Sequence, residues 1–582
     1  MNIKSRIKGL IFAVREELQY KEITKGFIEK SLLVSFVICL ALFIVSYLLF
    51  PMCFETGDDI TIMFFLAGYR TGVPQIYGMY NGFVWGAIVS FFYSVMPGIP
   101  WYSICTLFMI FVSCCAICYC ILLLNGDKHV VSSCIEFVMI YLTIFIYYVV
   151  VVQFTVTAAF NTVACIMILI CIALFDLPFE NMHYLLAALL LTIGYSIRER
   201  IALMSIVVVG IVLVLILIRK NNIKAFIYGL GIVGIFLFLF CGNRIYLQHS
   251  NMYDFKMYNS ARSTWKDYPH AKYEDAEDIY NSIGWDETLY NVAERWFFMD
   301  ENINIESFNV LNKNVSKNYT ESITFAKYCK NLISKLSSSE PFAIYMVGYS
   351  VMFLIYAYKK LSKCSNVVEI IIQGALIFVG WMLLLYFNYV GRLPQRVFAG
   401  VIYIYIVPSF VWCFSNIIKE CNKKILIGIA LVCIIGDIVL NIIGVGTLYA
   451  TRDKSFLKKQ FSTEWNSIAE YAINHKNVLY ITDDSLFECI GAPLLAYDDD
   501  KPINIMSWGG SLYNSPMYYK QLELNGRDHL YSDAFFDENI CFITKRVSLE
   551  FIDYMQKRYP KCRGKVIDAI DDDIVVYKWV ME

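Results

Sequence analysis

Continuous apolar runs of about twenty residues recur along this chain, and they limit its possible folds more than any other feature. Residues 31–50, 101–124 and 425–445 form three of them. Each run is about as long as a helix needs to cross a hydrocarbon core of ~30 Å. Only helices and closed barrels satisfy their backbone polar groups in lipid, and continuous rather than alternating runs favour helices. With 58% hydrophobic and 17% charged residues, the chain is predicted to be a polytopic membrane protein.

Basic residues predict the orientation of these helices, because cytoplasmic loops are enriched in Lys and Arg. The basic segment 1–30 and the basic clusters at 219–224, 359–363 and 419–424 are therefore placed in the cytoplasm. This alternation predicts about eleven spans, with the N-terminus inside and the C-terminus outside. The predicted spans are residues 31–50, 101–124, 134–152, 154–175, 183–197, 201–218, a seventh ending near 241, 341–358, 367–386, 396–416 and 424–447.

One apolar segment, residues 82–96, does not fit this alternation if it spans the membrane. It is short, rich in aromatic residues and glycine, and followed by Pro-Gly-Ile-Pro at 97–100. We therefore predict a juxtamembrane helix that lies on the outer surface. If the segment crossed the bilayer, the functional groups described below would lie on opposite faces.

The topology divides the chain into consecutive parts of different character. Strand-like runs at 477–482, 540–544 and 573–579, with a helical segment at 548–558, indicate a small α/β domain near the C-terminus. The predicted fold class is an all-α polytopic membrane bundle followed by this extracytoplasmic domain. The parts are a cytoplasmic basic segment (1–30), a membrane module (31–241) with an acidic first outer loop (51–100), a large extracytoplasmic loop (242–340), further membrane helices (341–447) and the α/β domain (450–582).

The cysteines placed outside the membrane are odd in number and irregularly spaced, so no disulfide framework is assumed and any pairing stays open. They are Cys53, Cys329, Cys489, Cys541 and Cys562.

Two adjacent acids, Asp58 and Asp59, lie a few residues beyond the first predicted span. Neighbouring carboxylates repel each other, so they cost stability unless a positive or protic group lies between them. Such a pair could supply a general base together with an orienting or metal-coordinating partner. The alternative is a solvated cap at the start of a helix near residue 60.

Two groups of arginines fall on the same predicted outer side. Arg198, Glu199 and Arg200 separate two apolar helices with no loop between them, and ionisable residues at such depth are functional candidates. Arg392 and Arg396 oppose the bias of basic residues toward the cytoplasm. Guanidinium groups suit phosphate binding, although these side chains could instead reach lipid head groups or pair with Glu199.

Further polar residues near these helix ends are predicted to line a substrate cavity. Gln153 belongs to a polar cluster at the junction of two spans, where it could also simply hydrogen-bond between helices. Tyr195 and Asn388 each precede one of the arginine groups. The predicted cavity residues are Glu199, Gln153, Tyr195 and Asn388.

This layout resembles the GT-C superfamily of membrane glycosyltransferases, which use polyprenyl-phosphate-linked sugars. The resemblance covers residues 31–340: one helix, an outer loop opening with Asp58 and Asp59, a surface helix and then a bundle. Residues 58–102 are also similar to uncharacterised bacterial membrane proteins of surface-polysaccharide loci. The family carries an acidic catalytic motif in its first outer loop, which implies that Asp59 is the general base. Asp58 would orient it or bind a divalent cation (Mg²⁺ or Mn²⁺), and Arg198, Arg200, Arg392 and Arg396 would hold the donor phosphate.

The resemblance implies transfer of a sugar from a polyprenyl-phosphate donor, in the cell membrane, to an extracytoplasmic glycan, glycolipid or protein. No nucleic-acid partner is expected, and no cofactor beyond the divalent cation. A polysaccharide polymerase or ligase is an alternative, since it would also have many spans, a large outer loop and outward arginines. A flippase or transporter is a second, although Asp437 is the only strong midplane charge and no internal repeat is visible. A catalytically inactive binding protein with the same fold is a third.

Overall fold

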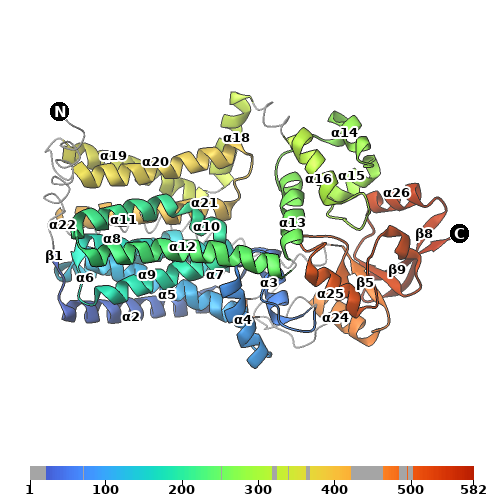
Figure 1. Ribbon diagram of the computed structural model, residues 1–582, viewed down its shortest axis with the longest axis horizontal. Coiled ribbons are helices and arrows are strands. Elements are labelled where there is room, and N and C mark those ends of the chain that lie inside the picture. The colour runs from blue at the N-terminus through green and yellow to red at the C-terminus, as the bar shows by residue number, and fades with distance from the viewer. Residues whose placement is uncertain are drawn as a thin grey trace.

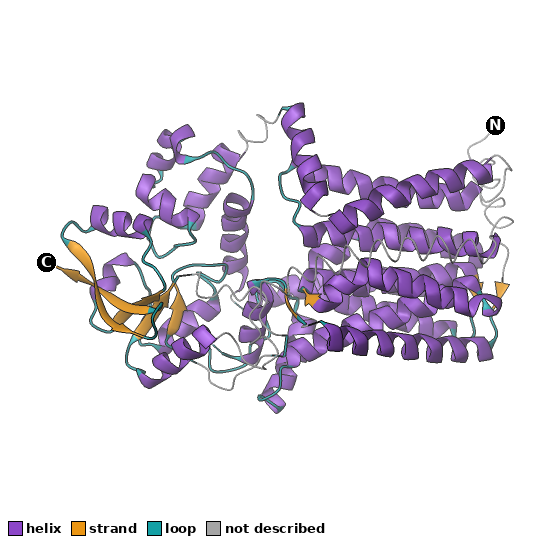
Figure 2. Ribbon diagram, turned by 180° about the vertical axis from the view of Figure 1, so that it is seen from behind, coloured by secondary structure: helices purple, strands orange, loops and turns teal. Residues whose placement is uncertain are grey.

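The structure is a computed structural model with a bundle of long helices at one end and a mixed helical and sheet region at the other (Figure 1). The N-terminal end of the described chain lies at the far end of the bundle, opposite the sheet (Figures 1 and 2). The structure describes residues 21–50, 52–69, 71–250, 252–316, 324–338, 340–361, 367–420, 463–483, 494–495 and 502–582.

The bundle is organised around one helix, α8 (Phe154–Leu174), which is buried over its whole length. Short π-helical turns join α6 to α7 and α21 to α22. The other bundle helices are α2 (Lys25–Leu49), α5 (Trp101–Asn125), α6 (Val130–Ile140), α7 (Ile146–Val150), α9 (Glu180–Ile197), α10 (Glu199–Met204), α11 (Ile206–Lys220), α12 (Ile223–His249), α19 (Glu340–Leu361), α20 (Val367–Tyr389), α21 (Gln395–Val401) and α22 (Val407–Glu420).

Within the described residues, 7 helices are long and apolar enough to cross a membrane. They correspond to the predicted spans beginning near 31, 101, 134, 154, 367 and 396 and to the seventh span, predicted to end near 241. Three further predicted spans fall on α9, α11 and α19, which lie alongside the long helices (Figure 1). α11 has only 15 residues because the helix breaks at Ser205. The last predicted span, 424–447, lies outside the described residues.

The apolar segment that did not fit the alternation forms α4 (Phe83–Val95), at the end of the bundle next to the sheet-containing half (Figure 1). With 13 residues it is about 20 Å long at ~1.5 Å per residue, too short for a core of ~30 Å. Phe91, Val95 and Met96 are exposed along it. A short helix with exposed apolar side chains at the end of a bundle fits the prediction of a helix that does not span.

Beyond α12, the chain forms a small helical unit with an aromatic core. Trp265, Trp285 and Phe308 are completely buried and pack edge to face or tilted against one another. The unit comprises α13 (Met252–Asp267), α14 (Glu277–Ser282), α15 (Glu287–Glu294) and α16 (Ile305–Leu311), followed by α18 (Phe325–Ser338).

The C-terminal part is a five-stranded sheet with strand order β6-β5-β7-β9-β8 and flanking helices. β5, β6 and β7 run parallel, and β9 is antiparallel to both β7 and β8. The strands predicted at 477–482, 540–544 and 573–579 are confirmed as β5, β7 and β9. The elements are α24 (Thr463–Asn474), β5 (Leu479–Thr482), β6 (Ile505–Ser507), α25 (Pro516–Leu524), β7 (Ile540–Thr544), α26 (Leu549–Arg558), β8 (Cys562–Ala569) and β9 (Val575–Met581).

The helical unit packs against the carboxyl ends of the parallel strands. The backbone N–H of Phe298 donates to the carbonyl of Trp508 at 3.0 Å, directly after β6. The buried carboxylate of Asp300 accepts from the Tyr554 hydroxyl and pairs with Arg558 of α26 at 2.7 Å. The helical unit and the C-terminal sheet region therefore share one hydrophobic core.

Among the cysteines placed outside, Cys329, Cys541 and Cys562 are free thiols, and Cys53 is buried. Cys489 lies outside the described residues.

Candidate functional site

A cavity of about 290 Å³ lies where the bundle meets the half of the molecule that contains α13–α16 and the sheet. The acid and the arginines predicted from separate parts of the sequence converge on it. Asp58 enters from the first turn of α3 (Gly57–Ala67), and the first arginine group comes from the link between α9 and α10. The second arginine group comes from the link between α20 and α21. The predicted residues that line the cavity are Asp58, Arg198, Glu199, Arg200, Arg392 and Arg396.

A short pair of strands places the acidic loop beside the start of α8. β2 (Cys53–Phe54) runs parallel to β3 (Val151–Val152), with Phe54 opposite Val152. This pairing brings the first turn of α3 next to the first turn of α8. It explains how residues almost a hundred positions apart form one site.

Asp59 lies below the cavity and does not line it. Its side chain is completely buried, and its Oδ1 accepts hydrogen bonds from the Tyr102 hydroxyl at 2.9 Å and the Phe154 backbone N–H at 3.0 Å. Burial raises the pKa of this carboxyl well above its usual range. The hydrogen-bonding capacity of Asp59, the residue implied as the general base, is therefore used inside the protein.

Asp58, one residue earlier, faces the cavity and is only half-buried. No residue in the described part of the chain donates a hydrogen bond to its carboxylate. Burial raises the pKa of Asp58, and the guanidinium groups of Arg396 and Arg198 partly oppose this rise. The pair is thus not a solvated helix cap: one acid is accessible to a ligand and the other is internal.

Arg198 is held over two aromatic rings. Its guanidinium lies 4.6 Å from the centroid of Tyr80 and 5.3 Å from that of Phe154, and these two rings stack on each other at 5.6 Å. Burial lowers its pKa to about 10, so the side chain remains a cation near neutral pH. Such stacking orients the planar group while leaving its N–H donors available to an anion.

The remaining arginines are not equivalent. Arg392 forms an ion pair with Asp267 at 2.8 Å, so its charge is largely compensated. Arg396 has no ion pair within 4.0 Å among the described residues, and its charge acts on Asp58 and Glu55. Arg200 is exposed at the rim. Arg198 and Arg396 are therefore the cations best placed for an anion beside Asp58.

Three predicted cavity residues are not among the residues that line this cavity. Gln153 is fully buried and its Oε1 caps α8 by accepting from the Val156 N–H at 3.1 Å. Asn388 donates from Nδ2 to the Tyr328 carbonyl at 3.3 Å. Tyr195 is buried in α9 beside the Phe236 ring. Helix ends use polar side chains for capping and packing, and the sequence does not distinguish this use from binding.

Several lining residues have no counterpart in the sequence-based set. Tyr77, Tyr80 and one face of α13 contribute to the cavity. Glu55 lies just outside it, accepting from the Tyr148 hydroxyl at 3.4 Å, and burial raises its pKa. Glu55 stands in the same acidic loop as Asp58 and could have been proposed from that position. The α13 face offers only a helical spacing of polar residues.

The residues that the structure describes contain no group of three or more His, Cys, Asp or Glu placed to hold a metal ion. Asp58 faces the cavity and Asp59 faces the interior, so the two do not present a joint pair of ligands. A divalent cation here would take Asp58 alone from the pair.

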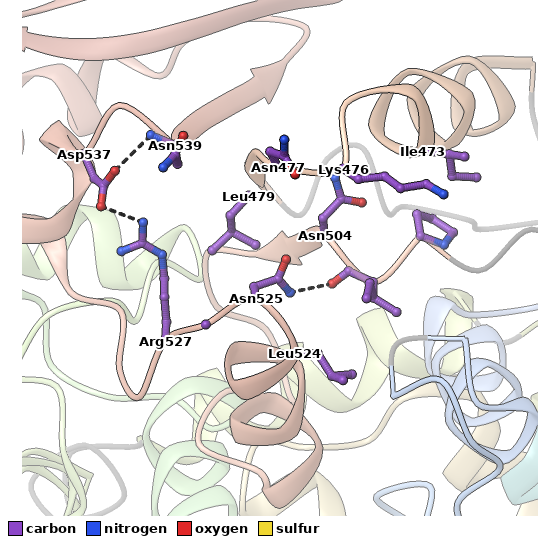
Figure 3. Close-up of a pocket in the computed structure, with 13 residues that line it drawn as sticks. Ile473, Lys476, Asn477, Leu479, Asn504, Leu524, Asn525, Arg527, Asp537 and Asn539 are labelled. Atoms are coloured by element: carbon purple, nitrogen blue, oxygen red, sulfur yellow. Dashed lines mark hydrogen bonds and ion pairs between the residues drawn. The ribbon is translucent and has the colours of Figure 1, made fainter.

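A second cavity, of about 780 Å³, lies in the C-terminal domain at the amino ends of β5 and β7 (Figure 3). Asparagine side chains dominate its polar lining, including Asn477, Asn525 and Asn539. Among the described lining residues, Asp537 is the only carboxylate, and it is paired with Arg527 at 2.7 Å. This cavity is larger, but its described lining offers no unengaged acid that could act as a base.

The fold and the cavity together define a polytopic helical membrane protein. Its charged cavity lies between the helix bundle and the part that contains the sheet. No protein-family model and no curated protein matches the sequence. Among solved structures, the chain is similar to ArnT from Cupriavidus metallidurans bound to undecaprenyl phosphate, with 9% identity over 95% of this chain and 98% of that chain, and a TM-score of 0.35. The same protein in the apo state gives 10% identity, coverage of 94% and 97%, and a TM-score of 0.33. At these values the likeness says nothing about the site.

Proposed function

We propose that this protein is a membrane glycosyltransferase of the GT-C type, which moves a sugar from a polyprenyl-phosphate donor to a hydroxyl of an acceptor on the outer side. Asp58 is the general base, in place of Asp59. The observation that carries this proposal is the meeting of one accessible carboxylate with the cations of Arg198 and Arg396 in one cavity at the end of the membrane bundle.

The chemistry needs few groups. A sugar on a lipid phosphate already has a good leaving group, so the reaction requires a base for the acceptor proton and cations for the departing phosphate. Asp58 accepts the proton as the acceptor oxygen bonds to the sugar carbon. As the bond from that carbon to the phosphate oxygen breaks, Arg198 and Arg396 stabilise the charge that develops on the phosphate.

The location of the cavity favours a donor held by a lipid. Arg198 stands between the apolar helices α9 and α10, and Arg396 lies in the first turn of α21. Both side chains are thus at the ends of bundle helices, where a phosphate on a membrane-embedded lipid would lie. A water-soluble nucleotide donor would not need its phosphate at this depth.

Asp59 supports the base without touching the substrate. By accepting from Tyr102 on α5 and Phe154 on α8, it anchors the first turn of α3 to two bundle helices. This anchoring fixes the direction in which the neighbouring Asp58 points.

The test is sugar transfer by protein purified into nanodiscs, with polyprenyl-phosphoryl sugars as donors and release of polyprenyl phosphate as the signal. Asp58→Asn should reduce turnover by about 10²–10⁴-fold, the usual contribution of a general base. Asp553→Asn, an exposed acid on α26, is the matched control and should retain full activity. Undiminished transfer by folded Asp58→Asn protein would refute the proposed base.

A further inference from the structure

Helix α13 forms the wall of the cavity that lies opposite the membrane helices. The side chains on this wall differ in chemistry from the arginines on the bundle side. Phe255, Lys256, Asn259, Ser260, Ser263 and Asp267 line the cavity. Their spacing places them along one side of a helix. On another side of α13, Tyr258, Ala261 and Trp265 are buried in the outer core. The helix is therefore fixed by its apolar side and presents a polar side to the cavity.

Charges are distributed unevenly between the two walls. The bundle side contributes Arg198, Arg200, Arg392 and Arg396. On α13, Asp267 is engaged with Arg392 and Lys256 lies about three turns earlier. The residues between them that line the cavity, Asn259, Ser260 and Ser263, form a neutral stretch. The neutral stretch consists of amide and hydroxyl groups, which suit ligand hydroxyls rather than a second phosphate.

A buried arginine sets the orientation of the amide in this stretch. Arg262 is 1% exposed and lies over the Trp296 ring at 4.9 Å. Its Nη2 and Nε donate to the Oδ1 of Asn259 at 2.6 and 3.2 Å. The oxygen of Asn259 is thus occupied, and its Nδ2 has no acceptor among the described residues. The hydroxyl of Ser260, exposed to the cavity one residue further on, likewise has no acceptor within that part of the chain.

The size of the cavity limits the ligand. At about 290 Å³ it is at the lower end of small-molecule pockets, which span roughly 300–1,000 Å³. Such a space suits a phosphate and one sugar ring rather than an oligosaccharide. Among the described residues, the lining holds five cations and three carboxylates, and this excess of positive charge matches a phosphate carrying an uncharged sugar.

We infer that the α13 wall selects the donor's sugar, that this sugar is a single uncharged monosaccharide, and that Asn259 and Ser260 donate hydrogen bonds to its hydroxyls. The inference rests on the proposed function and adds the substrate class and the residues that recognise it. Arg262 is a positioning residue, which acts by holding the Asn259 amide.

The experiment measures binding to protein in nanodiscs of three kinds of probe: bare polyprenyl phosphate; polyprenyl-phosphoryl glucose, galactose and mannose; and the corresponding uronates. Wild-type protein should bind at least one neutral sugar-lipid more tightly than bare polyprenyl phosphate. It should bind no uronate more tightly than bare polyprenyl phosphate. Ser260→Ala and Asn259→Ala should weaken binding of that sugar-lipid by about 5–30-fold, as expected for lost hydrogen bonds of ~1–2 kcal/mol. Their affinity for bare polyprenyl phosphate should not change.

The controls separate the two proposals. Asn309→Ala, at an exposed position of α16 away from the cavity, should behave as wild type. Ser260→Ala leaves the Arg262 contact intact, so it remains informative if Asn259→Ala fails to fold. Equal losses for bare and glycosylated lipid, no gain from any neutral sugar, or preference for a uronate would overturn the inference alone. Failure of bare polyprenyl phosphate to bind, or binding unaffected by Arg198→Ala, would instead refute the proposed function.

Discussion

The cavity beside α3 and the protein interior on its other side give two neighbouring carboxylates opposite environments. Asp58 is accessible, receives no hydrogen bond from the described residues and faces cations, whereas Asp59 is completely buried and receives hydrogen bonds from α5 and α8. Successive residues of a helix point about 100° apart, which suffices to separate the two environments. Adjacent acids in a sequence therefore need not share a function, and one can hold the other in place.

After loss of the base itself, the largest effect in the cavity should follow loss of the stacked cation. Arg198→Ala should lower turnover by about 10²–10³-fold, because it removes donors aimed at the developing phosphate charge. Arg198→Lys keeps the charge but loses the planar donors and the fit over Tyr80, so it should recover only part of the activity. Steady-state kinetics on polyprenyl-phosphoryl sugar measures both, with Arg563→Ala on β8 as control. A lysine variant as active as wild type would indicate a simple point charge.

Substitution of the internal Asp59 is expected to lower the stability of the protein. Asp59→Ala leaves the Tyr102 hydroxyl and the Phe154 N–H without an acceptor, and each buried unpaired group costs about 1–3 kcal/mol. Asp58→Ala removes no hydrogen bond between described residues and should change stability by less than ~1 kcal/mol. Thermal unfolding in nanodiscs compares the two variants. Equal destabilisation would contradict the separation of the two environments.

The pH dependence sharpens the comparison on the cavity side. Since burial raises the pKa of Asp58, the acid limb of kcat/KM should lie above the ordinary Asp value of ~3.9, with activity lost as pH falls through it. Arg396 lowers this pKa, so Arg396→Ala should move the acid limb to higher pH, by about one pH unit. Arg392→Ala should move it less, because Asp267 already compensates that charge. A shift to lower pH in Arg396→Ala would be inconsistent with Asp58 as the base.

The smallest effects on turnover are expected from substitution of predicted cavity residues that are buried away from the cavity. Tyr195→Phe should leave turnover within about twofold of wild type, because a side chain that does not touch the substrate contributes no differential binding. The same assay measures this variant. A large loss of turnover with unchanged thermal stability would return Tyr195 to the cavity.

Much of the fold could be predicted from hydropathy alone. The apolar runs locate the bundle helices, and the strands at 479–482, 540–544 and 575–581 follow from short β-branched and aromatic runs. β6 was missed because it has only 3 residues, and β8 because it is almost entirely exposed and its sequence, Cys-Arg-Gly-Lys-Val-Ile-Asp-Ala, has little alternation. Both strands are specified by pairing with neighbours rather than by their own pattern.

The charged residues of the site could be predicted from the sequence, but the directions in which their side chains point could not. Charge placement brought Asp58 and the arginines to one side of the membrane, and they line one cavity. The choice between Asp58 and Asp59 depends on the rotation of α3, which the β2–β3 pairing and Tyr102 determine. Gln153 and Asn388 were predicted to line the cavity and are not in its lining; capping and packing explain polar helix ends as well as binding does. The α13 wall depends on the fold of a distant loop, so no local signal identifies it.

The central claim is tested most directly by single-turnover sugar transfer in Asp58→Asn and Asp59→Asn proteins at equal folded concentration. We predict that Asp58→Asn loses about 10²–10⁴-fold in rate. Asp59→Asn, whose remaining side-chain oxygen can still accept from Tyr102 or Phe154, should transfer sugar at a rate within about tenfold of wild type. An active Asp58→Asn protein beside a folded but inactive Asp59→Asn protein would contradict the account.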